Sequence, residues 1–177
     1  MKTSLPFNKF IISIIAMIFM AYGCKQEPIN TLSEADARII LEQYMETINN
    51  ADMELIDKII DPDFELHSPF FPEPLKGIEN YKDFVMNTAN TFSDFKATIE
   101  DVVAKGDKVY GRFSMEGANT GPIGNIQATG KRFHITGLAI TKIVNGKIIK
   151  DETFWNVLGL YQQLGFTLAP PAASVSE

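Results

Sequence analysis

The chain is poor in cysteine, histidine and tryptophan. Its 177 residues include one cysteine, Cys24, two histidines, His67 and His134, and one tryptophan. A single cysteine excludes an intramolecular disulfide bond, so the core must hold the fold together even in an oxidising compartment. The two histidines lie far apart in the sequence, without a second metal-binding side chain at a fixed spacing, so a metal site has little support.

Long runs of like charge are also absent. The formal net charge is −6 at pH 7, from 16 lysines and arginines and 22 aspartates and glutamates. Nucleic-acid binding depends on clustered basic side chains, so we expect no nucleic-acid partner. The glycines of residues 117–130 do not form a Gly-x-Gly-x-x-Gly pattern that opens a helix, and no Walker lysine accompanies them. A phosphate-cradling loop is therefore not expected.

One apolar run stands at the N-terminus. Residues 10–22 follow two lysines and are too short to span a bilayer comfortably. The run leads into Ala-Tyr-Gly-Cys at 21–24, which resembles a bacterial lipobox, in which the cysteine takes a lipid. We predict that residues 1–24 are a lipoprotein-type signal peptide with lipidation at Cys24, and that 25–32 are a tether. The protein would be exported and lipid-anchored in the bacterial cell envelope; an ordinary secretory peptide or an uncleaved anchor is the alternative.

Three helices are predicted in the first half of the remaining chain. Ser33 is a good N-cap for residues 33–49, whose apolar side chains follow helical spacing. Asp52 can cap a second, short helix that ends at Asp61-Pro62, because the residue before a proline disfavours helical geometry. The third helix is expected over residues 78–91, after a proline-rich loop with exposed aromatic side chains.

Strands dominate the second half. Asn145-Gly146 is a strong type I′ hairpin signal, because both positions need a positive φ. A short helix at 158–164 and a disordered tail at 168–177 complete the chain. The predicted strands cover residues 64–67, 95–104, 109–116, 131–143 and 147–156.

This order of elements predicts an α+β domain over residues 33–167. Three N-terminal helices should pack on one face of a curved antiparallel sheet. The concave face leaves an internal pocket unless side chains fill it. The 13 phenylalanines and seven methionines suit either a lined cavity or an ordinary core.

Six short motifs follow one another along the chain. They are His67-Ser68-Pro69, Gly77-x-x-x-Tyr81, Gly117-Ala118-Asn119-Thr120-Gly121, Ala128-Thr129-Gly130-Lys131, Gly146-Lys147-Ile148 and Gln162-Gln163-Leu164-Gly165. Their order and spacing resemble the SnoaL-like polyketide cyclase and ester cyclase family, whose fold is the NTF2-like cone. The resemblance covers about residues 34–166. It implies cofactor-independent chemistry on a small hydrophobic carbonyl compound, in which an aspartate removes a proton next to the carbonyl before an intramolecular aldol condensation.

The resemblance places Asn156 at the position of that aspartate. An asparagine can orient a carbonyl or a water but cannot titrate, and it can equally cap the last helix. Strand alternation puts Glu152 on the face of Asn156, at a distance of about 13 Å, and Asp151 on the other face. His67 and His134 could act as bases near neutral pH. Asn156, Glu152, His134 and His67 are thus the candidate catalytic residues, although a strand-surface carboxylate and hydrogen-bonded structural histidines are the plainer interpretations.

Three functions stay open. The first is a SnoaL-like enzyme that acts as a cyclase, isomerase or hydrolase without a cofactor. The second is a non-catalytic, lipid-anchored module that binds an apolar small molecule. The third is self-association as a homodimer, with Phe70 and Phe71 of the aromatic loop as contacts.

Overall fold

The structure, a computed structural model, describes residues 32–169. The predicted signal peptide at 1–24 lies outside the described residues, as do all but the last residue of the tether and most of the predicted tail. Within residues 32–169, no helix is both long enough and apolar enough to cross a membrane.

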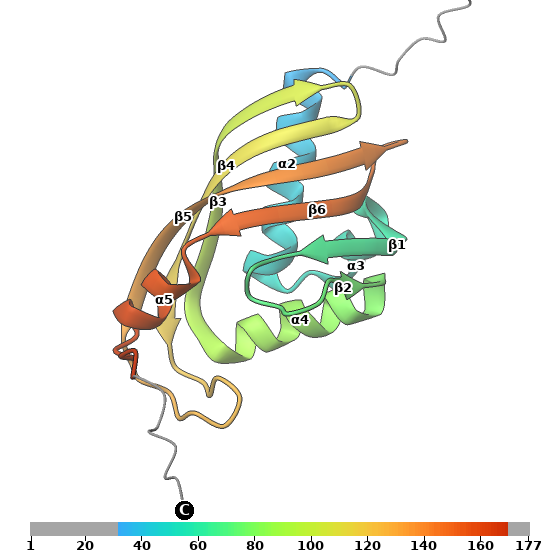
Figure 1. The fold of residues 1–177 in the computed structure, drawn as a ribbon. Coiled ribbons are helices and arrows are strands. Elements are labelled where there is room, and N and C mark those ends of the chain that lie inside the picture. Colours follow the sequence, from blue (N-terminus) through green and yellow to red (C-terminus); the bar gives the residue numbers. More distant parts are fainter. Residues whose placement is uncertain (1–31, 170–177) are drawn as a thin grey trace, which may run out of the picture.

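Three helices form one layer of the domain (Figure 1). They are α2 (Glu34–Asn50), α3 (Met53–Ile59) and α4 (Ile78–Thr91). Ser33 accepts a hydrogen bond from the backbone N–H of Asp36 at 3.1 Å, which begins α2. Asp52 caps α3 in the same way, by accepting from the N–H of Leu55 at 2.9 Å. All three predicted helices and both predicted caps are confirmed, but α3 ends at Ile59, before the predicted end at Asp61-Pro62, because a strand begins at Ile60.

Six strands form one sheet in the order β2-β1-β6-β5-β4-β3. They are β1 (Ile60–His67), β2 (Leu75–Lys76), β3 (Phe92–Lys105), β4 (Lys108–Asn119), β5 (Arg132–Val144) and β6 (Lys147–Trp155). The four long strands are antiparallel neighbours. Asn145 and Gly146 have φ values of 52° and 77°, so the predicted hairpin is confirmed.

The sheet differs from the prediction at its β1 edge. Strand β1 pairs with β6 in parallel, so the sheet is mixed rather than wholly antiparallel. The chain reaches this edge after α3, and no local signal specifies which way a strand will lie against a distant partner. Strand β1 also starts before Pro62, which falls in an irregular part of the register between Ile60 and Glu65. Proline is tolerated there because no regular ladder bond needs its missing N–H.

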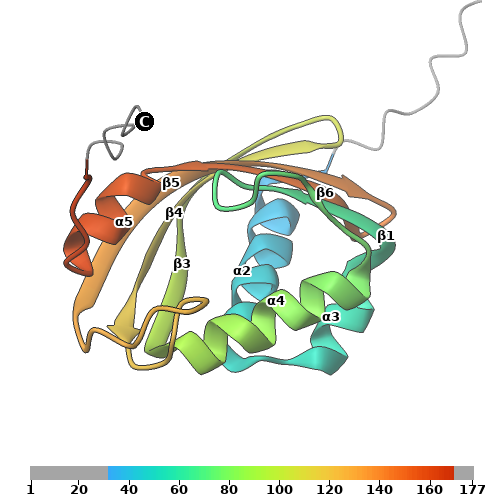
Figure 2. The same cartoon turned by 60° about the horizontal axis from the view of Figure 1, so that its bottom comes forward.

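The helices lie against the concave face of the curved sheet (Figure 2). Along β4, the inward side chains of Val109 and Phe113 are buried, whereas Tyr110 and Arg112 face outward. The helix α5 (Val157–Gln163) packs against the first residues of β5, where Leu160 and Leu164 form a second core cluster with Phe133. The two clusters share Met115 and Trp155 as neighbours.

Candidate functional site

A cavity of about 460 Å³ lies inside the cone and is lined by residues of α2, α4 and the concave face of the sheet. Its volume is within the usual range of small-molecule sites. Among residues 32–169, no lysine, arginine or histidine lines it, and Asp151 is the only carboxylate that does. Seven rings besides Tyr44 supply most of the wall, namely Phe70, Phe84, Phe92, Phe95, Phe113, Phe133 and Trp155.

Asp151 is the buried carboxylate of this cavity. It lies in β6, is 2% exposed, and faces α2 and β5. The Thr141 hydroxyl donates a 2.7 Å hydrogen bond to Oδ1, and the Tyr44 hydroxyl donates to Oδ2 over 3.4 Å. Burial raises the pKa of Asp151 to about 6, although both hydrogen bonds oppose the shift. The group can therefore change its protonation state near neutral pH.

Tyr44 lines the cavity and belongs to a buried network of hydroxyl groups that extends away from it. Its ring stacks on Tyr81 with centroids 5.7 Å apart. The Tyr81 oxygen lies 3.1 Å from the Thr47 hydroxyl, which donates in turn to the carbonyl oxygen of Tyr44 at 2.7 Å. Burial raises the pKa of both tyrosines above the ordinary value, so both stay protonated.

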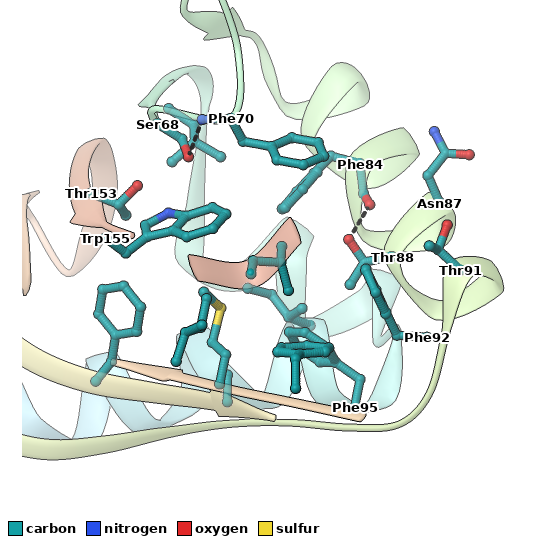
Figure 3. A pocket seen from close by; sticks show the side chains of 18 of the residues that line it. Ser68, Phe70, Phe84, Asn87, Thr88, Thr91, Phe92, Phe95, Thr153 and Trp155 are labelled. Atoms are coloured by element: carbon teal, nitrogen blue, oxygen red, sulfur yellow. Dashed lines mark hydrogen bonds between the residues drawn. The ribbon is translucent and has the colours of Figure 1, made fainter. Parts of the chain in front are cut away.

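The loop after β1 closes one side of the cavity (Figure 3). Phe70 stacks on Trp155 with centroids 6.2 Å apart, and Phe71 packs edge-on against Phe84 at 5.5 Å. Of the two aromatic side chains predicted to be exposed in this loop, only Phe70 is; it is 39% exposed and also lines the cavity. Thr88 on α4 adds a polar group to the wall but donates its hydrogen to the carbonyl oxygen of Phe84.

Asn156 does not line the cavity. Its side-chain oxygen accepts a hydrogen bond from the N–H of Gly159 at 2.8 Å, so it caps α5. Glu152 also lies outside the cavity lining and forms an ion pair with Lys150. The hydrogen bond from Lys150 lowers the pKa of Glu152. A carboxylate held in its ionised form outside the pocket is poorly placed to exchange protons with a bound ligand.

A β-bulge decides which residues of β6 face the cavity. The register shifts between the pairs Lys142–Lys150 and Ile143–Ile148, so one extra residue of β6 is accommodated there. Ile148 is buried before the bulge, and Asp151 is buried after it, although simple alternation would place them on opposite faces. The predicted alternation after the bulge is correct, but the face of Asp151, and not that of Glu152, lines the cavity.

Neither histidine lines the cavity. His134 on β5 approaches Glu116 at 3.8 Å on an exposed surface. His67 lies 3.2 Å from Glu65 and pairs in register with Glu152 across β1 and β6. The structure thus brings His67 and Glu152 together and keeps His134 and Asn156 apart from them. Within residues 32–169, no group of three histidine, cysteine, aspartate or glutamate side chains could hold a metal ion.

The recurring motifs support the cavity rather than supply its chemistry. The buried Asn119 accepts from the N–H of Thr129 at 2.8 Å and donates to the carbonyl oxygen of Gly121 at 2.7 Å. A side chain at Gly121 would collide with the backbone oxygen of Asn90. These contacts fix the loop that brings Ile123 to the cavity wall.

The motif Gln162-Gln163-Leu164-Gly165 also stabilises the fold around the cavity. The Gln163 side chain accepts a hydrogen bond from the N–H of His134 at 2.8 Å and donates to its carbonyl oxygen at 3.0 Å. This pairing attaches α5 to β5 as an additional strand would. Leu164 beside it is 1% exposed and seals the second core cluster.

Comparisons with known proteins agree with this geometry. No curated protein matches the sequence. Among solved structures, TsrD from Streptomyces laurentii is 29% identical with a TM-score of 0.67, over 76% of this chain and 98% of TsrD. A SnoaL-like polyketide cyclase candidate from Jannaschia sp. CCS1 has 20% identity and a TM-score of 0.65, over 84% and 100%. The polyketide cyclase candidate IdmH from Streptomyces antibioticus has 24% identity and a TM-score of 0.62, over 72% and 97%.

The last two likenesses show the fold alone because their identities are low. The sequence itself matches the SnoaL-like polyketide cyclases over residues 38–164, a span that runs from α2 to α5 and includes Tyr44 and Asp151. Most of the chain lies within that match. The protein therefore belongs to the SnoaL-like polyketide cyclase family.

Proposed function

We propose that the protein binds a small, neutral, hydrophobic carbonyl compound in the cavity and that Asp151 moves a proton of that compound. The observation that carries this proposal is a buried carboxylate, with a pKa near 6, in a wall that is mostly aromatic and aliphatic. A general base works best when its pKa lies near the working pH. Asp151 therefore takes the role that the family resemblance implies for position 156.

The proposed step needs no cofactor. The Asp151 carboxylate takes a proton from the carbon next to the carbonyl group, and the electron pair of that C–H bond passes into an enolate. In a ring closure, the enolate carbon forms a bond to a second carbonyl carbon of the same molecule. Asp151 then returns its proton to the new alkoxide, so the carboxylate is regenerated.

The wall of the cavity supports a neutral, flat ligand. The aromatic side chains favour conjugated or aromatic rings through stacking and edge-on contacts. Asp151 repels an anionic ligand when it is ionised, and the lining residues supply no positive side chain to offset that repulsion.

Hydrogen–deuterium exchange of 2-tetralone, a neutral bicyclic ketone, tests the proposal by proton NMR. Asp151→Asn keeps the size and shape of the side chain but removes the base. We expect the protein-catalysed exchange rate to fall at least about 100-fold in this variant. Glu152→Gln, one residue away and outside the cavity, is the matched control and should exchange at the wild-type rate. Equal rates in wild type and Asp151→Asn would refute the role of Asp151.

A non-catalytic, lipid-anchored binding module of the cell envelope is the alternative. It is favoured by the nearly complete burial of Asp151, whose oxygens already accept hydrogen bonds from Thr141 and Tyr44. Trp155 is the only tryptophan and lines the cavity, so its fluorescence reports ligand binding directly. A wild-type protein that binds 2-tetralone by this signal but does not accelerate exchange would favour the binding module.

A further inference from the structure

We propose that Tyr44 is a second catalytic residue of this site, which donates its phenolic hydrogen to the carbonyl oxygen of the substrate while Asp151 takes the neighbouring proton. This inference rests on the proposed function of Asp151. It concerns a different atom of the substrate, because Asp151 acts at carbon and Tyr44 acts at oxygen. The two roles can therefore be separated by experiment.

The positions of the two groups suit one ketone. Tyr44 comes from α2 and Asp151 from β6, and both line the cavity. The Tyr44 hydroxyl is 3.4 Å from Oδ2 of Asp151. In a ketone, one atom separates the carbonyl oxygen from the carbon that loses its proton. Two polar groups this close together can reach both atoms of one bound ketone at the same time.

Tyr44 makes only a weak hydrogen bond to Asp151 without a substrate. Hydrogen bonds between two oxygens usually span about 2.5–3.0 Å, so a separation of 3.4 Å is long. Asp151 also receives the shorter bond from Thr141, at 2.7 Å. A carbonyl oxygen at normal distance from Tyr44 is therefore the better acceptor, and it becomes better still as negative charge develops on it.

The surrounding hydroxyl groups hold Tyr44 in place. Thr47 gives its only hydrogen to the carbonyl oxygen of Tyr44, so it must accept from Tyr81 across their 3.1 Å separation. The Tyr81 hydrogen is thereby committed to Thr47, so Tyr81 does not donate to Tyr44. Phe64 packs edge-on against both tyrosine rings, with centroid distances of 6.3 Å to Tyr44 and 5.1 Å to Tyr81. Tyr81 is thus a positioning residue, whereas Tyr44 touches the substrate.

Tyr44 keeps its proton throughout the step. Burial is the largest cause that holds its pKa well above the usual value, and Tyr81 and Asp151 act in the same direction. The C–H bond breaks, its proton goes to Asp151, and the electron pair resides on the enolate oxygen that Tyr44 faces. A fixed donor aimed at this oxygen stabilises the charge without rearranging during the reaction.

The exchange assay with 2-tetralone gives the first test. Tyr44→Phe keeps the ring and its stacking but removes the donor, and we expect the exchange rate to fall about 100-fold. Tyr81→Phe is the matched control, because Tyr81 does not line the cavity, and its rate should fall no more than about tenfold. If Tyr44→Phe exchanges at nearly the wild-type rate while Asp151→Asn does not, the inference fails and the proposed function stands. If neither variant lowers the rate, the proposed function itself fails.

A binding measurement separates contact with the substrate from a structural role. The probes are 2-naphthol, whose oxygen imitates an enolate oxygen, and naphthalene, which lacks it. Both are titrated by calorimetry into Asp151→Asn and into the double variant that also carries Tyr44→Phe. We expect the second substitution to lower the preference for 2-naphthol by about fivefold or more and to leave naphthalene affinity unchanged. An unchanged preference would overturn the inference.

Naphthalene binding is also the folding control. If Tyr44→Phe loses it, 3-fluorotyrosine at position 44 replaces that variant, because it preserves the ring and makes the hydroxyl a stronger donor. The preference for 2-naphthol over naphthalene should then be greater than in the protein that keeps tyrosine at position 44. A preference that does not change would contradict contact between Tyr44 and the ligand oxygen.

Discussion

The stability of Asp151→Asn relative to the wild type should increase from acidic to neutral pH. The group is buried, and its pKa in the folded state is about 6, compared with 3.8 for an unperturbed aspartate. The folded state therefore binds a proton more tightly than the unfolded state does. The stabilisation from this protonation is fully present below pH 3.8 and is lost as the pH rises to about 6.

The size of the effect follows from the shift. A difference of one pKa unit corresponds to about 1.4 kcal/mol, so a shift from 3.8 to about 6 gives roughly 3 kcal/mol between acidic and neutral pH. Asn has no charge to bury at any pH and escapes this penalty. The Asp151→Asn variant should gain most of this amount in stability relative to the wild type between pH 4 and pH 7. The same substitution should abolish proton transfer, as expected where an active site is kept at the expense of stability.

Urea unfolding at intervals of one pH unit between pH 4 and pH 8 measures this effect. The quantity of interest is the difference in unfolding free energy between Asp151→Asn and the wild type, because other carboxylates titrate equally in both proteins. Glu152→Gln serves as the control, since Glu152 has a lowered pKa and should not produce a difference of this sign. A difference that stays constant from pH 4 to pH 8 would refute the reasoning, because it would mean that the pKa of Asp151 is not raised by folding.

Three further predictions concern residues outside the proton-transfer step. Asn156→Ala removes the cap at Gly159 and should lower the unfolding free energy by about 1 kcal/mol while exchange of 2-tetralone stays at the wild-type rate; a large loss of exchange would restore Asn156 as a catalytic candidate. Asn119→Ala leaves the N–H of Thr129 and the carbonyl oxygen of Gly121 without their buried partner, and it should lower the unfolding free energy in urea by about 1–3 kcal/mol. An unchanged unfolding free energy would contradict the stabilising role of these hydrogen bonds. Cys24→Ala should abolish incorporation of radioactive palmitate during growth, and persistent labelling would argue against lipidation at Cys24.

Much of the fold could be predicted because its signals are local. Ser33 and Asp52 lie directly before the helices that they cap, and Asn145-Gly146 forms the turn that its residue types favour. The parallel alignment of β1 with β6 could not be predicted in the same way, because it depends on contacts between residues far apart in the sequence. The two-residue β2 is too short to produce a recognisable pattern.

The site was harder to predict for a specific physical reason. A β-bulge near the start of β6 exchanges the inward-facing and outward-facing positions of the strand, so Asp151 faces inward on the same side as Ile148. Such a bulge has no clear signature in Lys147–Lys150. Tyr44 has the spacing of a core residue, and only the assembled structure shows its hydroxyl beside Asp151. The expected pocket could be inferred from the fold, but the identity of its carboxylate could not.

The pH dependence of 2-tetralone exchange tests the central claim most directly. Because Asp151 must be ionised to accept a proton, kcat/KM should rise with pH and level off above an apparent pKa of about 6. Asp151→Asn should lose this rise together with the activity, whereas Glu152→Gln should keep both. A wild-type rate that does not vary between pH 4 and pH 8, or a rise near pH 6 that survives in Asp151→Asn, would show that another group is the base.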